Sequence, residues 1–286
     1  MTGVALEKLA RDLGLPWPFP AVEHYQRIAA AIAARRRATG APLLAGICGP
    51  QGSGKSTMAA FVAAMLEAQG LPTAILSLDD LYLDPEDRPV HVHPLFATRG
   101  VPGTHDVALG ETVIDRLFAG ETSIPRFDKA TDRRRPQAEW DHFAGPAAIV
   151  LFEGWCVGAE PQDPTALAEP INRLEREEDP DGVWRGHANR ALASDYRRLF
   201  ARLGFLVYLA PPSFEAVLGW RTLQEEKLRA RVGDGAAGLM DAAALARFVM
   251  HYERITRHVA ATLPARSDLV AALAEDQNIV SLTPEI

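Results

Sequence analysis

Hydrophobic and polar positions divide this chain into two kinds of segment. Short, nearly continuous apolar runs predict β-strands at residues 42–48, 73–78, 147–152, 205–209, 268–273 and 279–282. Longer stretches with helical spacing predict helices at residues 56–69, 187–202, 214–231 and 241–263. Because strands and helices alternate, the pattern predicts an α/β fold with three α/β/α layers around a mostly parallel sheet.

The remaining segments suggest how the domain is organised. Residues 1–40 read as an N-terminal helical appendage, and residues 41–286 as one main domain. Residues 84–145 are rich in Pro, Gly, His and Arg, with one helical piece near 112–119, and are expected to form a substrate-binding insert between core strands. Residues 159–183 are polar and are expected to be a mobile connection.

The segment between the first apolar run and the first long helical stretch carries the strongest motif. It reads GPQGSGKST and matches the Walker A pattern, which predicts a P-loop NTPase fold. Glycines let backbone N–H groups point toward a polyphosphate, and the following helix adds its positive N-terminal end. The predicted nucleotide contacts are Gly49, Gln51, Gly52, Ser53, Gly54, Lys55, Ser56 and Thr57. By the mechanics of this motif, Lys55 reaches the outer phosphates of ATP and Ser56 binds Mg²⁺.

Acidic residues end two of the predicted strands. Asp79 and Asp80 follow the run at 73–78, and Glu153 follows the run at 147–152. Carboxyl ends of parallel strands share one edge of the sheet, so these side chains are expected beside the phosphate loop. A phosphotransferase needs one carboxylate to deprotonate the acceptor hydroxyl and another to hold Mg²⁺ or its waters. For Asp80, a role as a turn former or helix cap remains equally open.

Composition and charge exclude several classes of protein. The chain has 286 residues and a formal net charge of −7, which argues against a nucleic-acid partner. No apolar run reaches the ~20 residues of a membrane span, and the N-terminal residues lack a signal peptide's apolar core. We therefore expect a cytoplasmic protein without a membrane partner. The two cysteines, Cys48 and Cys156, lie in or beside predicted strands and are expected to be core residues.

Four further motifs resemble a known family. In order, they are SLDDLYL at 77–83, RGVPGTHD at 99–106, PRFDK at 125–129 and FEGWCVG at 152–158. Together with the phosphate loop, they resemble the D-glycerate 3-kinase family, in the phosphoribulokinase and uridine kinase branch of P-loop kinases. The resemblance implies that Asp79 is the general base and Glu153 the acid on the magnesium side. It also implies that Tyr82 is a wall of the acceptor pocket and that Asp80 either binds a water of the metal or supports one of the metal's ligands.

A glycerate pocket needs a positive group that pairs with the acceptor's carboxylate. The insert offers Arg99 and His105 in a glycine-rich turn, and Lys129 and Arg133 further along. We predict that these four residues bind the acceptor. For Arg133, a solvated charge run over residues 133–135 is the alternative.

The helical stretch at 214–231 carries a surplus of positive charge. Lys227 and Arg231 lie four residues apart and repel one another unless an anion lies near. This spacing predicts that residues 214–235 form a helical lid that closes on the ATP phosphates. Lys227 is a candidate contact of this lid. The family resemblance also implies a basic lid helix here, with Arg221 and Arg229 as further candidates, although these two also fit an ordinary salt-bridge ladder through Glu225.

These features favour an ATP-dependent kinase that phosphorylates a hydroxyl of D-glycerate, giving 3-phosphoglycerate. A P-loop kinase for another small alcohol, such as uridine or pantothenate, is the alternative within the class. A nucleoside pocket needs aromatic stacking, whereas the insert offers mainly cations. An ATP-binding regulatory protein without transfer activity is the alternative from another class. The sequence leaves the oligomeric state open.

Overall fold

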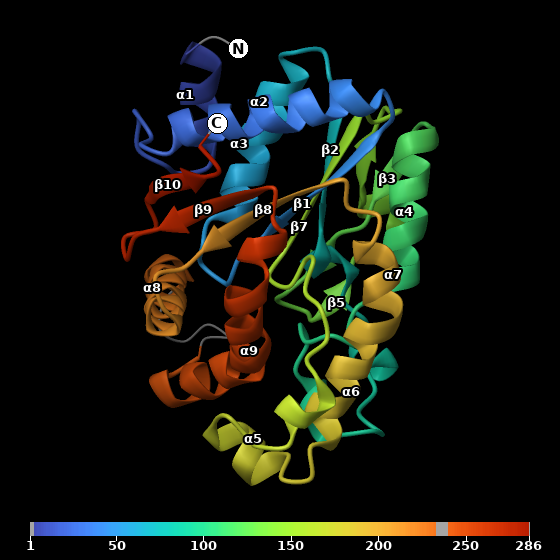
Figure 1. Ribbon diagram of the computed structural model, residues 1–286, viewed down its shortest axis with the longest axis vertical. Coiled ribbons are helices and arrows are strands. Elements are labelled where there is room, and N and C mark those ends of the chain that lie inside the picture. The colour runs from blue at the N-terminus through green and yellow to red at the C-terminus, as the bar shows by residue number, and fades with distance from the viewer. Residues whose placement is uncertain (1–2, 233–239, 286) are drawn as a thin grey trace.

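The core of the protein is a six-stranded, mostly parallel sheet. The computed structural model describes residues 3–232 and 240–285 of the chain. The strands have the order β10-β9-β8-β1-β7-β2, and β10 alone among them runs antiparallel to its neighbour (Figure 1). Their bounds are β1 Leu43–Cys48, β2 Thr73–Ser77, β7 Ile149–Gly154, β8 Phe205–Ala210, β9 Leu269–Leu273 and β10 Ile279–Thr283. Each lies within two residues of a strand predicted from the apolar runs.

Helices cover both faces of this sheet. Their bounds are α1 Gly3–Asp12, α2 Val22–Thr39, α3 Lys55–Glu67, α4 Val107–Ala119, α5 Arg173–Glu178, α6 Val183–Ala191, α7 Arg197–Phe200, α8 Phe214–Val232 and α9 Ala242–Thr262. Side chains of α2, α3 and α8 share a core with one face. Side chains of α4, α7 and α9 share a core with the other. The three-layer α/β/α prediction is confirmed. Among the described residues, no helix is long and apolar enough to span a membrane.

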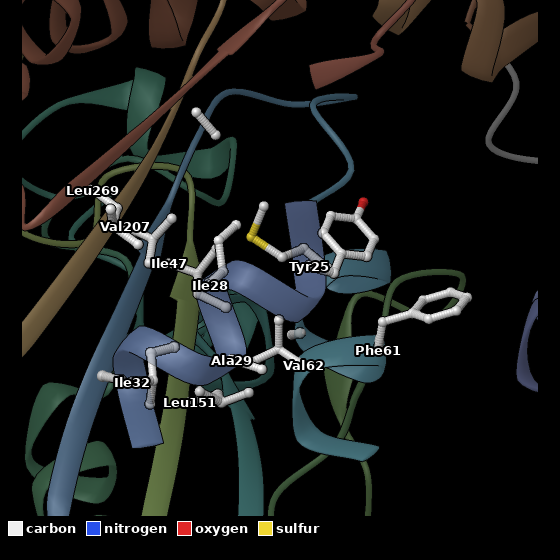
Figure 2. Close-up of a cluster of buried hydrophobic side chains, with 14 of the residues drawn as sticks. Tyr25, Ile28, Ala29, Ile32, Ile47, Phe61, Val62, Leu151, Val207 and Leu269 are labelled. Atoms are coloured by element: carbon white, nitrogen blue, oxygen red, sulfur yellow. The ribbon is translucent and has the colours of Figure 1, made fainter. Parts of the chain in front are cut away.

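The core under α2 shows how the N-terminal segment is held. Figure 2 shows Ile28 and Ile32 of α2 close to Ile47 of β1 and Leu151 of β7. All four side chains are fully buried. Because burial of one such side chain stabilises the fold by roughly 1.5–3 kcal/mol, α2 is firmly attached to the sheet.

The predicted insert, residues 84–145, combines a helix with two small two-stranded sheets. Strand β3 (Thr122–Ile124) pairs with β6 (Asp141–Phe143), and β4 (Phe127–Asp128) pairs with β5 (Arg133–Arg134). Helix α4 begins at Val107, and the side chain of Asp106 caps it by accepting a hydrogen bond from the Leu109 N–H at 2.9 Å.

The stretch at 159–183 contains more regular structure than a polar connection suggests. A 3₁₀ turn, Pro164–Leu167, is followed by α5, and the two lie near α9. Glu175 of α5 is fully buried and pairs with Arg254 of α9. Polar composition misled the sequence prediction here, because the charges pair inside the protein instead of facing water.

Candidate active site

The Walker A residues form the loop that joins β1 to α3. Gly52 and Gly54 have φ values of 80° and 86°, in the left-handed region that favours glycine. At Gly52 a Cβ would lie 2.7 Å from the Cβ of Trp220 on α8. The Nζ of Lys55 donates to the Pro50 carbonyl at 3.0 Å, so this side chain lies across the loop. The loop therefore has the backbone conformation that a phosphate-binding cradle requires.

A hydroxyl and a carboxylate meet beside the start of α3. The Ser56 hydroxyl donates to Oε1 of Glu153 at 2.9 Å, and the Ser77 hydroxyl donates to the same oxygen at 3.0 Å. Glu153 lies in β7, which neighbours both β1 and β2, and is 6% exposed. Hard oxygen donors of this kind fit Mg²⁺. Within residues 3–232 and 240–285, no group of three or more His, Cys, Asp or Glu side chains fits a metal.

Asp79 follows β2, which β7 separates from β1 and its phosphate loop in the sheet. Its Oδ1 accepts a hydrogen bond from the Tyr82 hydroxyl at 2.6 Å, and its Oδ2 accepts one from Lys129 Nζ at 2.5 Å. Burial alone would raise the pKa of Asp79, but the charge of Lys129 and the two hydrogen bonds outweigh burial and lower the pKa to about 2. The carboxylate is therefore ionised at neutral pH.

A pair of arginines shares one carboxylate next to Lys129. Asp132 accepts two hydrogen bonds from the buried Arg88, at 2.7 and 2.8 Å, and one from Arg99 at 2.6 Å. Arg99 also donates to the Lys129 carbonyl at 3.4 Å and lies over the ring of Tyr82, 5.8 Å from its centroid. Two guanidinium groups on one carboxylate leave a net positive charge, so this corner of the site suits an anion.

One cavity of about 450 Å³ is lined by the phosphate loop, Asp79, Arg99 and Lys129, whereas Glu153 and the pair of Arg88 and Asp132 lie outside its lining. Its volume is in the range of small-ligand sites. Of the predicted residues, the cavity lining includes Gln51, Gly52, Gly54, Lys55, Ser56, Thr57, Asp79, Tyr82, Arg99, Lys129 and Arg221. The site thus combines a phosphate loop, a carboxylate and cations from the insert.

Several other predicted residues lie outside this lining. Oδ2 of Asp80 accepts a hydrogen bond from Arg126 at 2.9 Å, and Oδ1 accepts one from the Phe127 N–H at 3.0 Å, so its carboxylate anchors β4. Arg133 forms an exposed ion pair with Glu86 at 2.7 Å. Gly49 and Ser53 pack against each other inside the phosphate loop, since a Cβ at Gly49 would lie 2.7 Å from the Ser53 hydroxyl oxygen.

His105 lies behind Tyr82 rather than in the cavity. Its ring stacks on Tyr82 with centroids 4.9 Å apart, and its Nδ1 shares a hydrogen bond with the Tyr196 hydroxyl at 2.5 Å. Burial lowers the pKa of His105 to about 3. A neutral imidazole does not attract an anion as a cation would. In this geometry, His105 instead packs behind Tyr82 and supports its ring.

The candidate lid residues also divide into those that line the cavity and those that do not. Arg221 lines the cavity, pairs with the buried Glu225 at 3.0 Å and lies over the ring of Phe248. Arg229 donates to the Met240 carbonyl at 3.0 Å. The side chain of Lys227, and residues 233–235 of the expected lid, lie outside the described part of the chain.

Three aromatic residues of the cavity, Trp155, Phe248 and Tyr252, were not predicted. The indole N–H of Trp155 donates to the Gly100 carbonyl at 2.8 Å, and the Tyr252 hydroxyl donates to the Arg99 carbonyl at 2.8 Å. Their rings meet edge to face, 5.0 Å apart. They hold the backbone that carries Arg99. The position of Trp155 beside Glu153 was a usable signal, whereas Tyr252 lies on α9 with no local motif around it.

Comparisons with known proteins find relatives of this chain among kinases. No family model matches the sequence. The Schizosaccharomyces pombe protein named uncharacterized kinase mug58 is 35% identical over 229 residues, which are 74% of this chain and 79% of that protein. The chloroplastic D-glycerate 3-kinase of Arabidopsis thaliana is 25% identical over 254 residues, which are 82% of this chain and 52% of the plant protein. This chain therefore spans about half the length of the plant protein.

The fold also has a close counterpart among solved structures. The D-glycerate 3-kinase from Cryptococcus neoformans superposes with a TM-score of 0.74 at 23% identity. The superposition covers 92% of this chain and 99% of the fungal one. At this level of identity, the likeness establishes the shared fold of the two chains.

Proposed function

This chain belongs to the D-glycerate 3-kinase family of P-loop kinases, and we propose that it transfers the γ-phosphoryl group of ATP to a hydroxyl of D-glycerate, giving 3-phosphoglycerate. One observation carries the proposal. Asp79, Arg99 and Lys129 line the same cavity as the phosphate loop. This supports Asp79 as the base and Arg99 and Lys129 as the groups that bind an anionic acceptor.

The phosphates of ATP bind to the loop at 49–57, through its N–H groups and Lys55. Ser56 and Glu153 are the residues that would hold Mg²⁺. When bound, this ion would neutralise part of the negative charge of the phosphates. Arg221 adds a further positive charge on the α8 side of the cavity.

The acceptor is held by its carboxylate. Arg99 and Lys129 pair with that group, while Tyr82 forms a wall beside it. One hydroxyl of the acceptor then lies at Asp79, which takes its proton. The acceptor oxygen forms a bond to the γ-phosphorus as the bond from that phosphorus to the bridging oxygen breaks, and ADP leaves with the electron pair.

The proposal is tested by offering several acceptors in parallel. Purified protein with Mg²⁺ and ATP receives D-glycerate, L-glycerate, uridine, pantothenate or ribulose 5-phosphate, and ADP formation is measured for each. We expect the highest kcat/KM with D-glycerate and a phosphomonoester on its C3 oxygen by phosphorus NMR. ADP formation with uridine but not with glycerate would show that D-glycerate is not the acceptor. Failure of every acceptor would favour a regulatory ATP-binding protein.

A further inference from the structure

Both carboxylate oxygens of Asp79 are engaged by donors of the chain itself. Tyr82 donates to one oxygen and Lys129 to the other, at 2.6 and 2.5 Å. A carboxylate whose two oxygens both accept strong hydrogen bonds is a weak base. For Asp79 to take a proton from a hydroxyl, at least one of these donors has to move away.

The two donors differ in their freedom to move. Tyr82 is 5% exposed, and its ring packs against His105 and Phe127. Lys129 lies in the turn between β4 and β5, and 58% of its side chain is exposed. An ammonium group on a flexible, solvated stem changes partners at little cost. Lys129 is therefore the donor that can leave Asp79.

The groups around Lys129 also favour its movement away from Asp79. Arg99 hydrogen-bonds the Lys129 carbonyl and is held by Asp132, which Arg88 shares. This fixed cluster of two arginines and one carboxylate attracts an anion to the position next to Lys129. A carboxylate bound there competes directly with Asp79 for the ammonium group.

We propose that Lys129 caps Asp79 and that the carboxylate of the acceptor draws Lys129 away, so that Asp79 becomes available as a base only when an anionic acceptor is bound. This inference rests on the proposed function, in which Asp79 is the base and the acceptor carries a carboxylate. The cap suppresses transfer to water. In that side reaction, a water oxygen bonds to the γ-phosphorus, its proton passes to Asp79, the bond to the bridging oxygen breaks, and ADP and inorganic phosphate result.

The test is ATP hydrolysis without any acceptor in K129M, which keeps the length of the side chain and removes its charge. We expect K129M to release inorganic phosphate at least about fivefold faster than the unmodified protein, because Asp79 regains basicity. In the same variant, D-glycerate should bind more weakly by calorimetry and should stimulate ATP turnover by a smaller factor. K129R retains a donor at this position and should keep acceptor-free hydrolysis low.

R135M is the matched control, since Arg135 is an exposed cation of the same segment whose nearest acidic partner is Glu139 at 4.0 Å. Its acceptor-free hydrolysis should equal that of the unmodified protein. Unchanged or slower hydrolysis in K129M, with a melting temperature like that of the unmodified protein, would disprove the cap. Phosphorylation of glycerate in that case leaves the proposed function standing. A different outcome is faster hydrolysis in K129M together with no phosphorylation of glycerate by the unmodified protein. That result would show that glycerate is not the acceptor, and it would also disprove the release of Lys129 by the acceptor.

Discussion

At the scale of single residues, Asp79 is the group on which the proposed chemistry depends. A general base contributes about 10²- to 10⁴-fold to a rate. D79N keeps the shape of the side chain and removes its basicity, so kcat with D-glycerate should fall about 10³-fold while the Kd for ATP changes less than about twofold. The measurements are steady-state kinetics and nucleotide titration.

E139Q serves as the control for D79N, because it also removes one negative charge, from an exposed side chain near Arg135. Its kcat should match that of the unmodified protein. Equal kcat values for D79N and E139Q would remove Asp79 from the mechanism.

His251 gives the fold a measurable dependence on pH. It is 2% exposed, and its Nδ1 lies 3.1 Å from the Arg247 carbonyl oxygen. Burial lowers the pKa of His251 to about 4, below its usual value near 6.5. Between these two values the unfolded chain binds a proton that the folded protein does not, so the free energy of unfolding falls as the pH falls.

The contribution of one such histidine approaches about 1.4 kcal/mol per pH unit within that window. H251Q should therefore lose less stability than the unmodified protein between pH 6.5 and pH 4, whatever its stability at neutral pH. Urea unfolding at several pH values measures this slope. H142Q, on an exposed side chain, is the control, and identical slopes for H251Q and the unmodified protein would contradict the account.

At the scale of elements, two ion pairs join the same two helices, α5 and α9, in different surroundings. Arg254 pairs with Glu175 at 2.6 Å, with side chains 7% and 0% exposed. Arg247 pairs with Glu178 at 2.6 Å, with side chains 45% and 41% exposed. The comparison isolates the effect of burial on an ion pair, since the helices and residue types are the same.

E175Q leaves the Arg254 charge buried without a carboxylate, and should lower the free energy of unfolding by about 3–5 kcal/mol. E178Q should lower it by less than about 1 kcal/mol, because water solvates Arg247. Denaturant unfolding with a common m-value gives both numbers. Similar losses in the two variants would show that burial does not set the strength of these pairs.

The sequence predicted the central elements well and the insert poorly. Strands β1, β2, β7, β8 and β9 carry continuous apolar runs because helices cover both their faces, and this leaves a clear pattern. The two-stranded sheets of the insert have strands of two or three residues, too short for any periodicity. Helix α5 was missed for a related reason, because its buried Glu175 looks like a surface charge in the sequence.

At the scale of the whole molecule, the site combines segments that are far apart in the chain. The phosphate loop, Asp79 and Glu153 were predictable because each ends or follows a strand of the sheet. Arg88, Asp132 and Tyr252 were not, because their roles arise from contacts between separate elements. The motif around His105 predicted that it lies in the acceptor pocket, whereas in the structure its ring is buried behind Tyr82 and supports that residue.

Charge is also organised at this scale. The chain has a formal net charge of −7, yet Lys55, Arg99, Lys129 and Arg221 converge on one cavity. The overall charge repels anions while the cavity attracts them, so recognition of an anionic acceptor depends on these local cations. We therefore propose that the acceptor is selected by its carboxylate.

The most direct measurement compares D-glycerate with D-glyceramide, which has the same hydroxyl groups and an uncharged amide in place of the carboxylate. With Mg²⁺ and saturating ATP, we expect kcat/KM for D-glyceramide to be at least about 100-fold lower, because Arg99 and Lys129 lose their charged partner. Equal kcat/KM values for the two compounds, or no phosphorylation of D-glycerate, would contradict the account.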